Sequence, residues 1–166
     1  MMFLRYVSRV AVTCLLVPLH QVCAQAATAP TTAPATIMSA ERLRAIGDSI
    51  SPGASRTAQL GKGSGYTYAV THRDSTGGVE MHADWTDVFV VESGTATMLT
   101  GGVLEGAKES SPGEWRGGTP KGATRAPLHP GDVVIIPAGT PHQMQLAAGE
   151  RISYLAFKVA AQSTAK

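Results

Sequence analysis

The sequence predicts an all-β fold, a sandwich or barrel, with one short helix near its N-terminus. Two observations support this: from residue 55 onward, short runs alternate in polarity or are rich in β-branched residues, and Gly, Pro, Asp or Ser separate them at short intervals. Many short strands divided by such turn residues are typical of β-sandwiches and barrels. The predicted strands are residues 66–71, 79–83, 87–91, 95–99, 133–137, 143–146 and 152–159.

Residues 1–26 are predicted to be a secretory signal peptide. Arg5 and Arg9 precede an apolar run over residues 10–19, and small residues around Ala24 and Ala26 offer cleavage sites. This order of charged, apolar and small residues is typical of exported proteins. The apolar run is shorter than the roughly 20 residues that a membrane-spanning helix needs. We therefore expect an exported protein, periplasmic or secreted, with no membrane span after processing.

Removing this segment changes the chemistry of the chain. Both cysteines, Cys14 and Cys23, lie within it, so a chain that starts at Ala27 has no disulfide and no thiolate ligand. The 14 Lys and Arg residues include Arg5 and Arg9, which leaves 12 basic residues beside 12 acidic ones. Because the basic residues form no cluster, we expect no nucleic-acid partner.

The processed chain is predicted to hold a tether and one domain. Residues 27–38 are rich in Ala, Thr and Pro and are predicted to be a flexible tether, while residues 39–166 form a single domain. Ser39 is predicted to cap a helix through Ile46, with Gly47 at its end. Residues 101–126 are predicted to be a long loop or loose hairpin, in which Trp115 either covers the barrel mouth or packs on the surface.

The sharpest motif is Gly131-Asp-Val-Val-Ile-Ile-Pro137-Ala-Gly139-Thr-Pro-His142. Physically it predicts a turn, a buried strand, a Pro-Gly corner and a histidine at the start of the next strand. Glycine, five residues, Pro-x-Gly, two residues and histidine is similar to the second conserved motif of the cupin superfamily. That motif often has an asparagine four residues after the histidine, where this sequence has Leu146.

A modified first cupin motif lies upstream. Cupins usually show His-x-His, three or four residues, a Glu, six residues and a Gly. Here Glu80-Met-His82 is followed by four residues, Asp87, six residues and Gly94, so Glu80 and Asp87 replace the usual histidine and glutamate. The resemblance covers about residues 66–159 and implies a double-stranded β-helix, the cupin or jelly-roll barrel.

Together these motifs predict a site for one divalent metal ion. Side chains two residues apart on a strand share a face, so Glu80 and His82 point to the same side. Two imidazoles and two carboxylates suit a first-row divalent ion; the oxygen ligands favour Fe(II) or Mn(II), with Zn(II), Ni(II) and Cu(II) also open. If one carboxylate binds, the set is the facial triad of non-haem iron oxygenases. The predicted ligands are Glu80, His82, Asp87 and His142.

Each of these residues also has a structural alternative. His82 and His142 could be satisfied core histidines of a metal-free barrel. Glu80 could form an ion pair or bind a substrate cation, because a buried carboxylate without a partner is costly. The predicted substrate-binding residues are Phe89, Met144 and Tyr154, with core packing as the alternative for Tyr154.

The resemblance implies a protein that binds a small organic molecule beside a metal. Cupins with such sites include dioxygenases, decarboxylases and isomerases, which implies an enzyme acting on a small oxygen-rich or carbonyl-bearing metabolite. The alternative is a non-catalytic, small-molecule-binding or sensing protein of the cell envelope, and the fold alone does not choose between them. The resemblance also implies a homodimer that pairs through outer strands.

Overall fold

The computed structural model describes residues 34–50 and 55–162. The predicted signal peptide and residues 27–33 of the predicted tether lie outside this range, and residues 34–38 form neither helix nor strand. Ile37–Lys166 is a compact unit. Within residues 34–50 and 55–162, no helix has the length and apolar character needed to cross a membrane.

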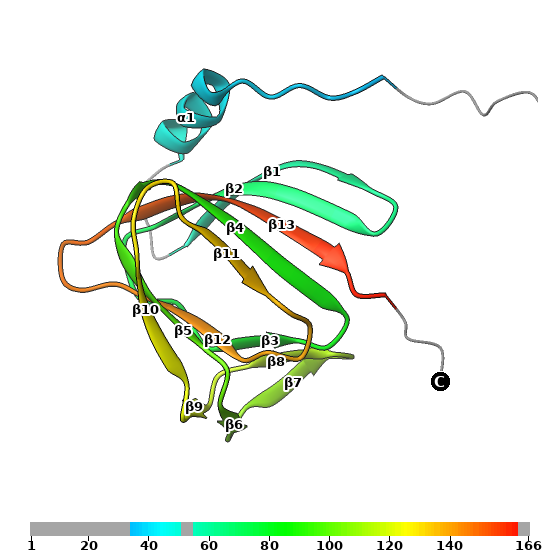
Figure 1. Ribbon diagram of the computed structural model, residues 1–166, viewed down its shortest axis with the longest axis vertical. Coiled ribbons are helices and arrows are strands. Elements are labelled where there is room, and N and C mark those ends of the chain that lie inside the picture. The colour runs from blue at the N-terminus through cyan, green and yellow to red at the C-terminus, as the bar shows by residue number, and fades with distance from the viewer. Residues whose placement is uncertain (1–33, 51–54, 163–166) are drawn as a thin grey trace, which may run out of the picture. The chain divides into compact units, whose positions relative to one another are not determined.

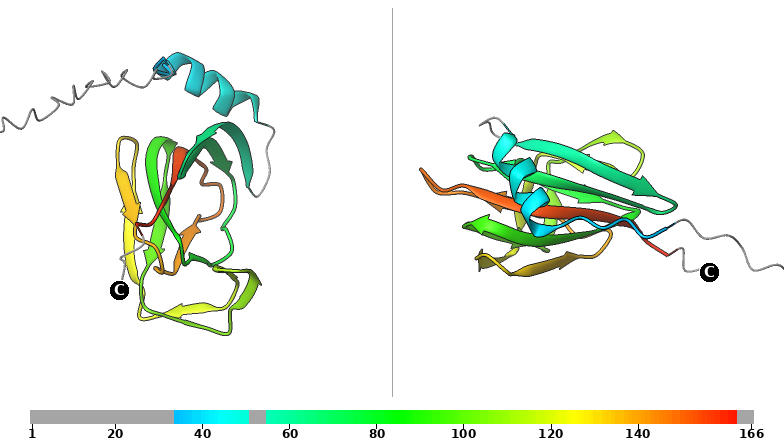
Figure 2. Two further views of the ribbon diagram at one scale, coloured as in Figure 1. Left: turned by 90° about the vertical axis from the view of Figure 1, so that its right-hand side faces the viewer. Right: turned by 90° about the horizontal axis from the view of Figure 1, so that it is seen from above.

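Two antiparallel sheets form the walls of the barrel (Figure 1, Figure 2). The five-stranded sheet has the order β1 (Arg56–Gly63), β2 (Tyr66–Arg73), β13 (Ile152–Ala160), β4 (Trp85–Gly94) and β11 (Val133–Ile136). The six-stranded sheet has the order β10 (Thr124–Leu128), β5 (Ala96–Thr100), β12 (His142–Gln145), β3 (Glu80–His82), β8 (Glu114–Arg116) and β7 (Lys108–Ser111). A third sheet pairs β6 (Val103–Glu105) with β9 (Thr119–Lys121). The predicted all-β jelly-roll class with one short helix is confirmed.

Alternation along the strands determines which side chains face the barrel interior. On β4, Asp87, Phe89 and Val91 are buried, whereas the residues between them are partly exposed. This period of two is that of a β-strand, whose successive side chains point to opposite faces. The apolar members join a core cluster of Phe89, Val91, Ala96, Met98, Leu128, Ile136, Met144, Ile152 and Tyr154.

Helix α1 (Ala40–Ser49) begins where the sequence predicts but ends later. Ser39 is the N-cap, and its side chain accepts a hydrogen bond from the backbone N–H of Arg42 at 3.1 Å. The prediction that Gly47 ends the helix is wrong, because the helix continues through Ser49. Gly47 lacks the positive φ by which glycine ends a helix and is instead the buried residue of α1, packed near Val70 of β2.

Of the two alternatives predicted for residues 101–126, the hairpin is confirmed and the loop is wrong, because β7 pairs with β8 and β6 pairs with β9 in nested antiparallel pairs. This segment contains β6 to β9 and the start of β10, and its Trp115 lies within β8, opposite Met81 of β3. Most of its residues are exposed, so no apolar alternation marks the strands in the sequence. Gly102 and Gly118 adopt positive φ between strands, where a Cβ would overlap the backbone of the facing arm of the hairpin.

Candidate metal centre

Pairing around the short strand β3 brings the two motifs together. On one side of β3, His142 of β12 lies opposite Glu80, and on the other side Glu114 of β8 lies opposite His82. The backbone N–H of Gly139, in the corner before β12, donates to the carbonyl of His82 at 2.7 Å. Residues far apart in the sequence are therefore fixed within one patch of the sheet.

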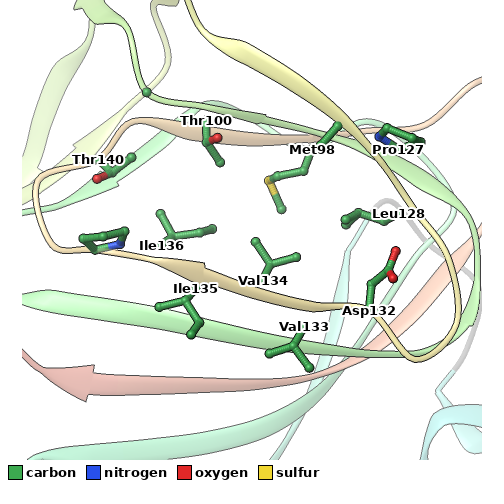
Figure 3. Close-up of a pocket in the computed structure, with 13 residues that line it drawn as sticks. Met98, Thr100, Pro127, Leu128, Asp132, Val133, Val134, Ile135, Ile136 and Thr140 are labelled. Carbon is green, nitrogen blue, oxygen red and sulfur yellow. The ribbon is translucent and has the colours of Figure 1, made fainter.

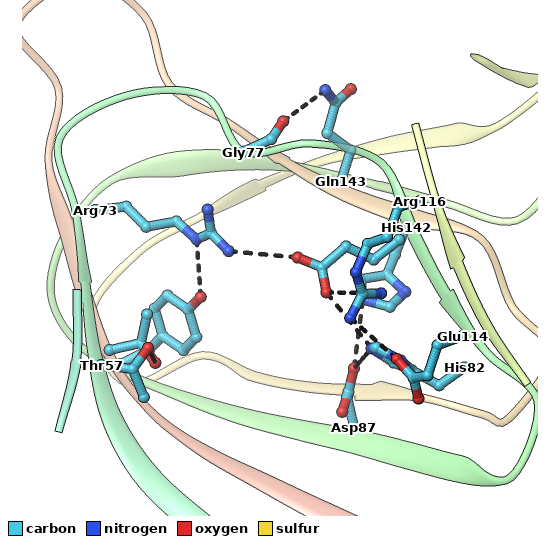
Figure 4. Close-up of polar contacts among 12 residues, drawn as sticks. Thr57, Arg73, Gly77, His82, Asp87, Glu114, Arg116, His142 and Gln143 are labelled. Atoms are coloured by element: carbon cyan, nitrogen blue, oxygen red, sulfur yellow. Dashed lines mark hydrogen bonds and ion pairs between the residues drawn. The ribbon is translucent and has the colours of Figure 1, made fainter. Parts of the chain in front are cut away.

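Three of the four predicted ligands offer donor atoms close together. Ligand atoms of Glu80, His82 and His142 all lie within 4.8 Å of one another, and Figure 4 shows the two histidines side by side. The side chains of His82 and His142 are only 2% and 7% exposed, whereas that of Glu80 is 28% exposed. Two imidazoles and one carboxylate suit a first-row divalent ion, so these residues could hold a metal.

Asp87 approaches both histidines from β4. Its Oδ2 lies 3.3 Å from Nε2 of His82 and 3.3 Å from Nε2 of His142, and its side chain is 3% exposed. Burial raises the pKa of Asp87, but hydrogen bonds from His142 and His82 and the charge of Lys158 hold it well below its usual range. Asp87 is outside the group of three with mutually close ligand atoms. Its role as a fourth ligand stays a prediction.

Lys158 is a site residue that sequence reasoning missed. It lies on β13 directly opposite Asp87, and its Nζ donates to Nε2 of His82 at 2.7 Å and to Oδ1 of Asp87 at 2.9 Å. The ammonium therefore uses the His82 lone pair that a metal would need. Alternation on β13 could have revealed it, since Tyr154, Ala156 and Lys158 share one face and all line the same cavity.

Acceptors at Nδ1 orient both imidazoles. Nδ1 of His82 lies 2.7 Å from Oε2 of Glu114, and Nδ1 of His142 lies 3.1 Å from the carbonyl oxygen of Thr140. Both acceptors take a proton from Nδ1. In the neutral imidazole, Nε2 then carries the lone pair that metal-binding histidines use, and in the protonated imidazole Nε2–H donates to Asp87. Burial and the charge of Lys158 lower the pKa of His82, but hydrogen bonding to Asp87 and Glu114 outweighs them, and the net shift is upward.

Two arginines contact the carboxylate of Glu80. Its oxygens lie 3.7 Å from Nη2 of Arg73 and 3.4 Å from Nη1 of Arg116. Arg116 also bonds Glu114 at 3.0 Å, so it joins the carboxylate of Glu80 to the carboxylate that orients His82. The ion pair proposed from the sequence as an alternative role for Glu80 is present. It leaves the carboxylate within reach of both histidines.

A cavity of about 230 Å³ lies beside these residues. Phe89, Met144 and Tyr154, the three predicted substrate-binding residues, all line it and are also buried core residues. The rings of Phe89 and Tyr154 are in contact, with centroids 4.8 Å apart. Core packing is therefore confirmed for Tyr154, while contact with a substrate stays a prediction. The exposed lining residues Thr57 and Gly78 mark where the cavity opens.

A second cavity, of about 450 Å³, lies between edge strands β10 and β11 (Figure 3). Its wall is mostly apolar, and among the described residues that line it, Asp132 is the one with an acidic or basic side chain. Although this cavity is larger, it lacks the histidines and carboxylates that metal chemistry requires. The chemistry of the barrel is therefore concentrated in the smaller cavity.

Similarity to solved structures identifies the architecture. No family model matches the sequence, and no curated protein matches it. The structure resembles the Cnp3 cupin domain of Schizosaccharomyces pombe, with a TM-score of 0.51, 13% identity and coverage of 69% of this chain and 67% of that chain. This chain has the cupin fold. Proteins from Thermus thermophilus and Thermotoga maritima also have similar structures.

For two further solved structures, the region similar to this chain spans almost their whole length. A protein from Thermus thermophilus gives a TM-score of 0.53 at 17% identity, over 75% of this chain and 96% of that chain. A predicted oxalate decarboxylase from Thermotoga maritima gives a TM-score of 0.51 at 13% identity, over 69% of this chain and 96% of that chain. At these identities the comparisons establish the cupin fold and leave the chemistry to the site residues.

The Asp87–Lys158 pair predicts how the free energy of unfolding depends on pH. Since folding lowers the pKa of Asp87, its contribution is fully present above the ordinary value of 3.8 and is lost as the pH falls through the folded value. Asp87→Asn should lower the free energy of unfolding of the metal-free protein by about 1–3 kcal/mol at pH 7, because the partly buried ammonium loses its carboxylate.

Denaturant unfolding from pH 7 to pH 3 measures this effect. The wild-type protein should lose stability as the pH falls below 4, and Asp87→Asn should flatten that dependence. The exposed Asp84 is a matched control, and Asp84→Asn should change the free energy of unfolding by less than about 0.5 kcal/mol. Equal acid dependence in the wild-type and Asp87→Asn proteins would contradict the pairing.

Glu114→Gln tests the support of His82. The amide can no longer fix the proton on Nδ1 as the carboxylate does, so the affinity for Zn(II) should fall about 10- to 100-fold, the range found for partners of metal-binding histidines. Competition with a chromogenic chelator measures the affinity. Glu105, which pairs with Lys121 at 2.6 Å away from the site, provides the control variant Glu105→Gln. Equal losses in both variants would show that Glu114 has no specific role.

Proposed function

We propose that this protein is an exported, metal-dependent cupin enzyme that acts on a small organic molecule in the cavity beside Glu80, His82 and His142. These three residues hold one divalent first-row ion, with iron or manganese favoured and zinc, nickel or copper also open. The reaction class is that of metal-dependent dioxygenases, decarboxylases or isomerases. Asp87 is the candidate fourth ligand.

The observation that supports this proposal best is the pair of oriented histidines. Both Nε2 atoms point to one place, both Nδ1 atoms have acceptors, and the Glu80 carboxylate lies within 4.8 Å of the two rings. If His82 and His142 served only to pack the core, the partly exposed Glu80 carboxylate beside both rings would add little stability. The donor set therefore fits the proposed ion.

The metal, when bound, polarises an oxygen of the substrate or of water. The chain's own residues prepare the site for this. Glu114 and Thr140 fix the tautomers of the two histidines, and the apolar Phe89 and Met144 exclude water from one wall of the cavity. Asp87, kept ionised by its neighbours, can accept a hydrogen bond and so orient a donor group in the cavity.

A non-catalytic binding protein is the second candidate, and Lys158 is the observation that favours it. Its ammonium bonds His82 at 2.7 Å and Asp87 at 2.9 Å, which satisfies the site without a metal. In that case the barrel would bind or sense a small molecule in the cell envelope through the same cavity. Both candidates share the cavity but differ in whether turnover occurs.

Incubation with a mixture of small carbonyl- and carboxyl-bearing metabolites separates the two candidates. Protein loaded with Fe(II) or Mn(II) is mixed with these compounds, and mass spectrometry follows each one. An enzyme yields many product molecules per protein chain, and Glu80→Gln, which weakens the metal site, should abolish this. Retention of one unchanged ligand per chain, with or without metal, would support the binding protein instead.

Export and pairing complete the proposal. Expression of the whole chain in a Gram-negative host should give a periplasmic product whose mass lacks the first 26 residues. A full-length product in the cytoplasm would contradict export.

The proposed homodimer is supported by two exposed apolar residues on edge strand β11. Val133 and Ile135 are 60% and 66% exposed.

A further inference from the structure

The cavity of about 230 Å³ combines two cationic side chains with an apolar wall. Arg73 of β2 and Lys158 of β13 both line it, and their side chains are 13% and 38% exposed. Neither belongs to the predicted ligand set. The lining also includes the apolar side chains of Phe89, Met98, Met144 and Ala156.

Arg73 is held in one orientation within this cavity. Its Nε donates to the hydroxyl of Tyr154 at 3.0 Å, and its Nη2 lies 3.7 Å from Oε1 of Glu80. Its Nη1 lies against Gly77, where a Cβ would overlap it. Figure 4 shows the guanidinium directed toward the metal centre. A planar guanidinium fixed in this way is suited to binding a carboxylate.

The charges around the centre balance without a metal. Three carboxylates and three cations are joined by hydrogen bonds and ion pairs, namely Glu80, Asp87 and Glu114 with Arg73, Arg116 and Lys158. A divalent ion would therefore leave two positive charges in excess. Uncompensated charge is costly in a buried cavity, and a bound anion offsets it where a neutral molecule cannot.

The size of the cavity limits the anion. Its volume of about 230 Å³ compares with roughly 30 Å³ per molecule of liquid water, so it holds a molecule of a few carbon atoms. A short carbon chain can contact Phe89 and Met144 while a charged end group lies near Arg73 and Lys158. Both parts of such a molecule thus have a matching surface.

We propose that the ligand of this cavity is a small organic carboxylate, bound through Arg73 and Lys158 with its carbon skeleton on the apolar wall. The inference rests on the proposed function, because the bound metal supplies the positive charge that the carboxylate offsets. Arg73 is then a residue that determines specificity, distinct from those that hold the ion. It selects anions over neutral molecules of the same shape.

Calorimetric titration with malonate, succinate and their uncharged diamides tests this inference. The titrated protein is loaded with Zn(II), and its zinc content is measured in the same sample. At least one dicarboxylate should bind at least tenfold more tightly than its diamide. Arg73→Gln should lower that affinity at least tenfold without loss of zinc, Arg73→Lys should be intermediate, and the exposed Arg125→Gln should bind like the wild-type protein.

The outcomes separate this inference from the proposed function. Equal binding of acids and amides, no binding of either, or unchanged affinity in Arg73→Gln would overturn the carboxylate site. Absence of zinc in the wild-type sample would instead count against the metal centre, and with it against the positive charge that the carboxylate is proposed to offset. Should Arg73→Gln fail to fold, the comparison of acid with amide on the wild-type protein decides.

Discussion

His142→Ala should lower the affinity of this protein for Zn(II) or Mn(II) more than about 100-fold, beyond the range found for residues that only support a ligand. The Nε2 atom of His142 is one of the three donors within 4.8 Å of one another, and it belongs to a strand that no other donor shares. With it removed, Glu80 and His82 are left on a single strand, and two donors rarely suffice for a tight site.

A matched histidine shows whether the effect is specific. His129 is exposed and pairs with Asp132 at 3.6 Å, so His129→Ala removes the same group at a distance from the centre. Its metal affinity should equal that of the wild-type protein. Chelator competition gives both affinities, and circular dichroism checks that each variant is folded. Unchanged metal binding in folded His142→Ala would exclude the site described here.

Lys158→Met is expected to act in the opposite direction and raise metal affinity about tenfold or more, equivalent to about 1.4 kcal/mol. In the metal-free protein the ammonium occupies the lone pair of His82 and lies close to where a divalent cation must bind. Its removal frees the donor atom and also removes repulsion between like charges, which is of order a few kcal/mol at 4 Å in a partly buried site. Methionine keeps the length and apolar stem of the side chain.

Lys121→Met is the control for Lys158→Met. Lys121 pairs with Glu105 on the exposed β6–β9 sheet, and its replacement changes the net charge equally. Its metal affinity should stay at the wild-type value. Weaker metal binding in Lys158→Met than in the wild-type protein would mean that the lysine supports the ion rather than competing with it.

Local patterns in the sequence predicted most of the strands, and the resemblance to cupins implied the barrel and pointed to residues that the structure brings together. The β-branched run over residues 87–91 predicted part of β4, and the spacing between Glu80 and His82 placed both on one side of β3. The Pro-Gly corner before His142 predicted where a distant strand returns. These features depend on neighbouring residues, so they can be recognised without knowing which strands pair.

Other parts of the site depend on strand register, which the sequence does not reveal directly. Lys158 meets Asp87, and Glu114 meets His82, only because β13 pairs with β4 and β8 pairs with β3 in particular alignments. Glu114 lies in a segment of exposed residues with no apolar alternation, where strands are hard to predict. Gly47 was misjudged for a related reason, since its packing against Val70 is a tertiary contact.

The most direct test of the metal centre is the metal content of the mature protein. The chain is expressed with its first 26 residues, purified without a chelator or histidine tag, and analysed by inductively coupled plasma mass spectrometry. We predict one divalent first-row ion per chain in the wild-type protein and none in His142→Ala. A protein that holds no metal after purification, and takes up none from Fe(II), Mn(II), Zn(II), Ni(II) or Cu(II), would contradict the account.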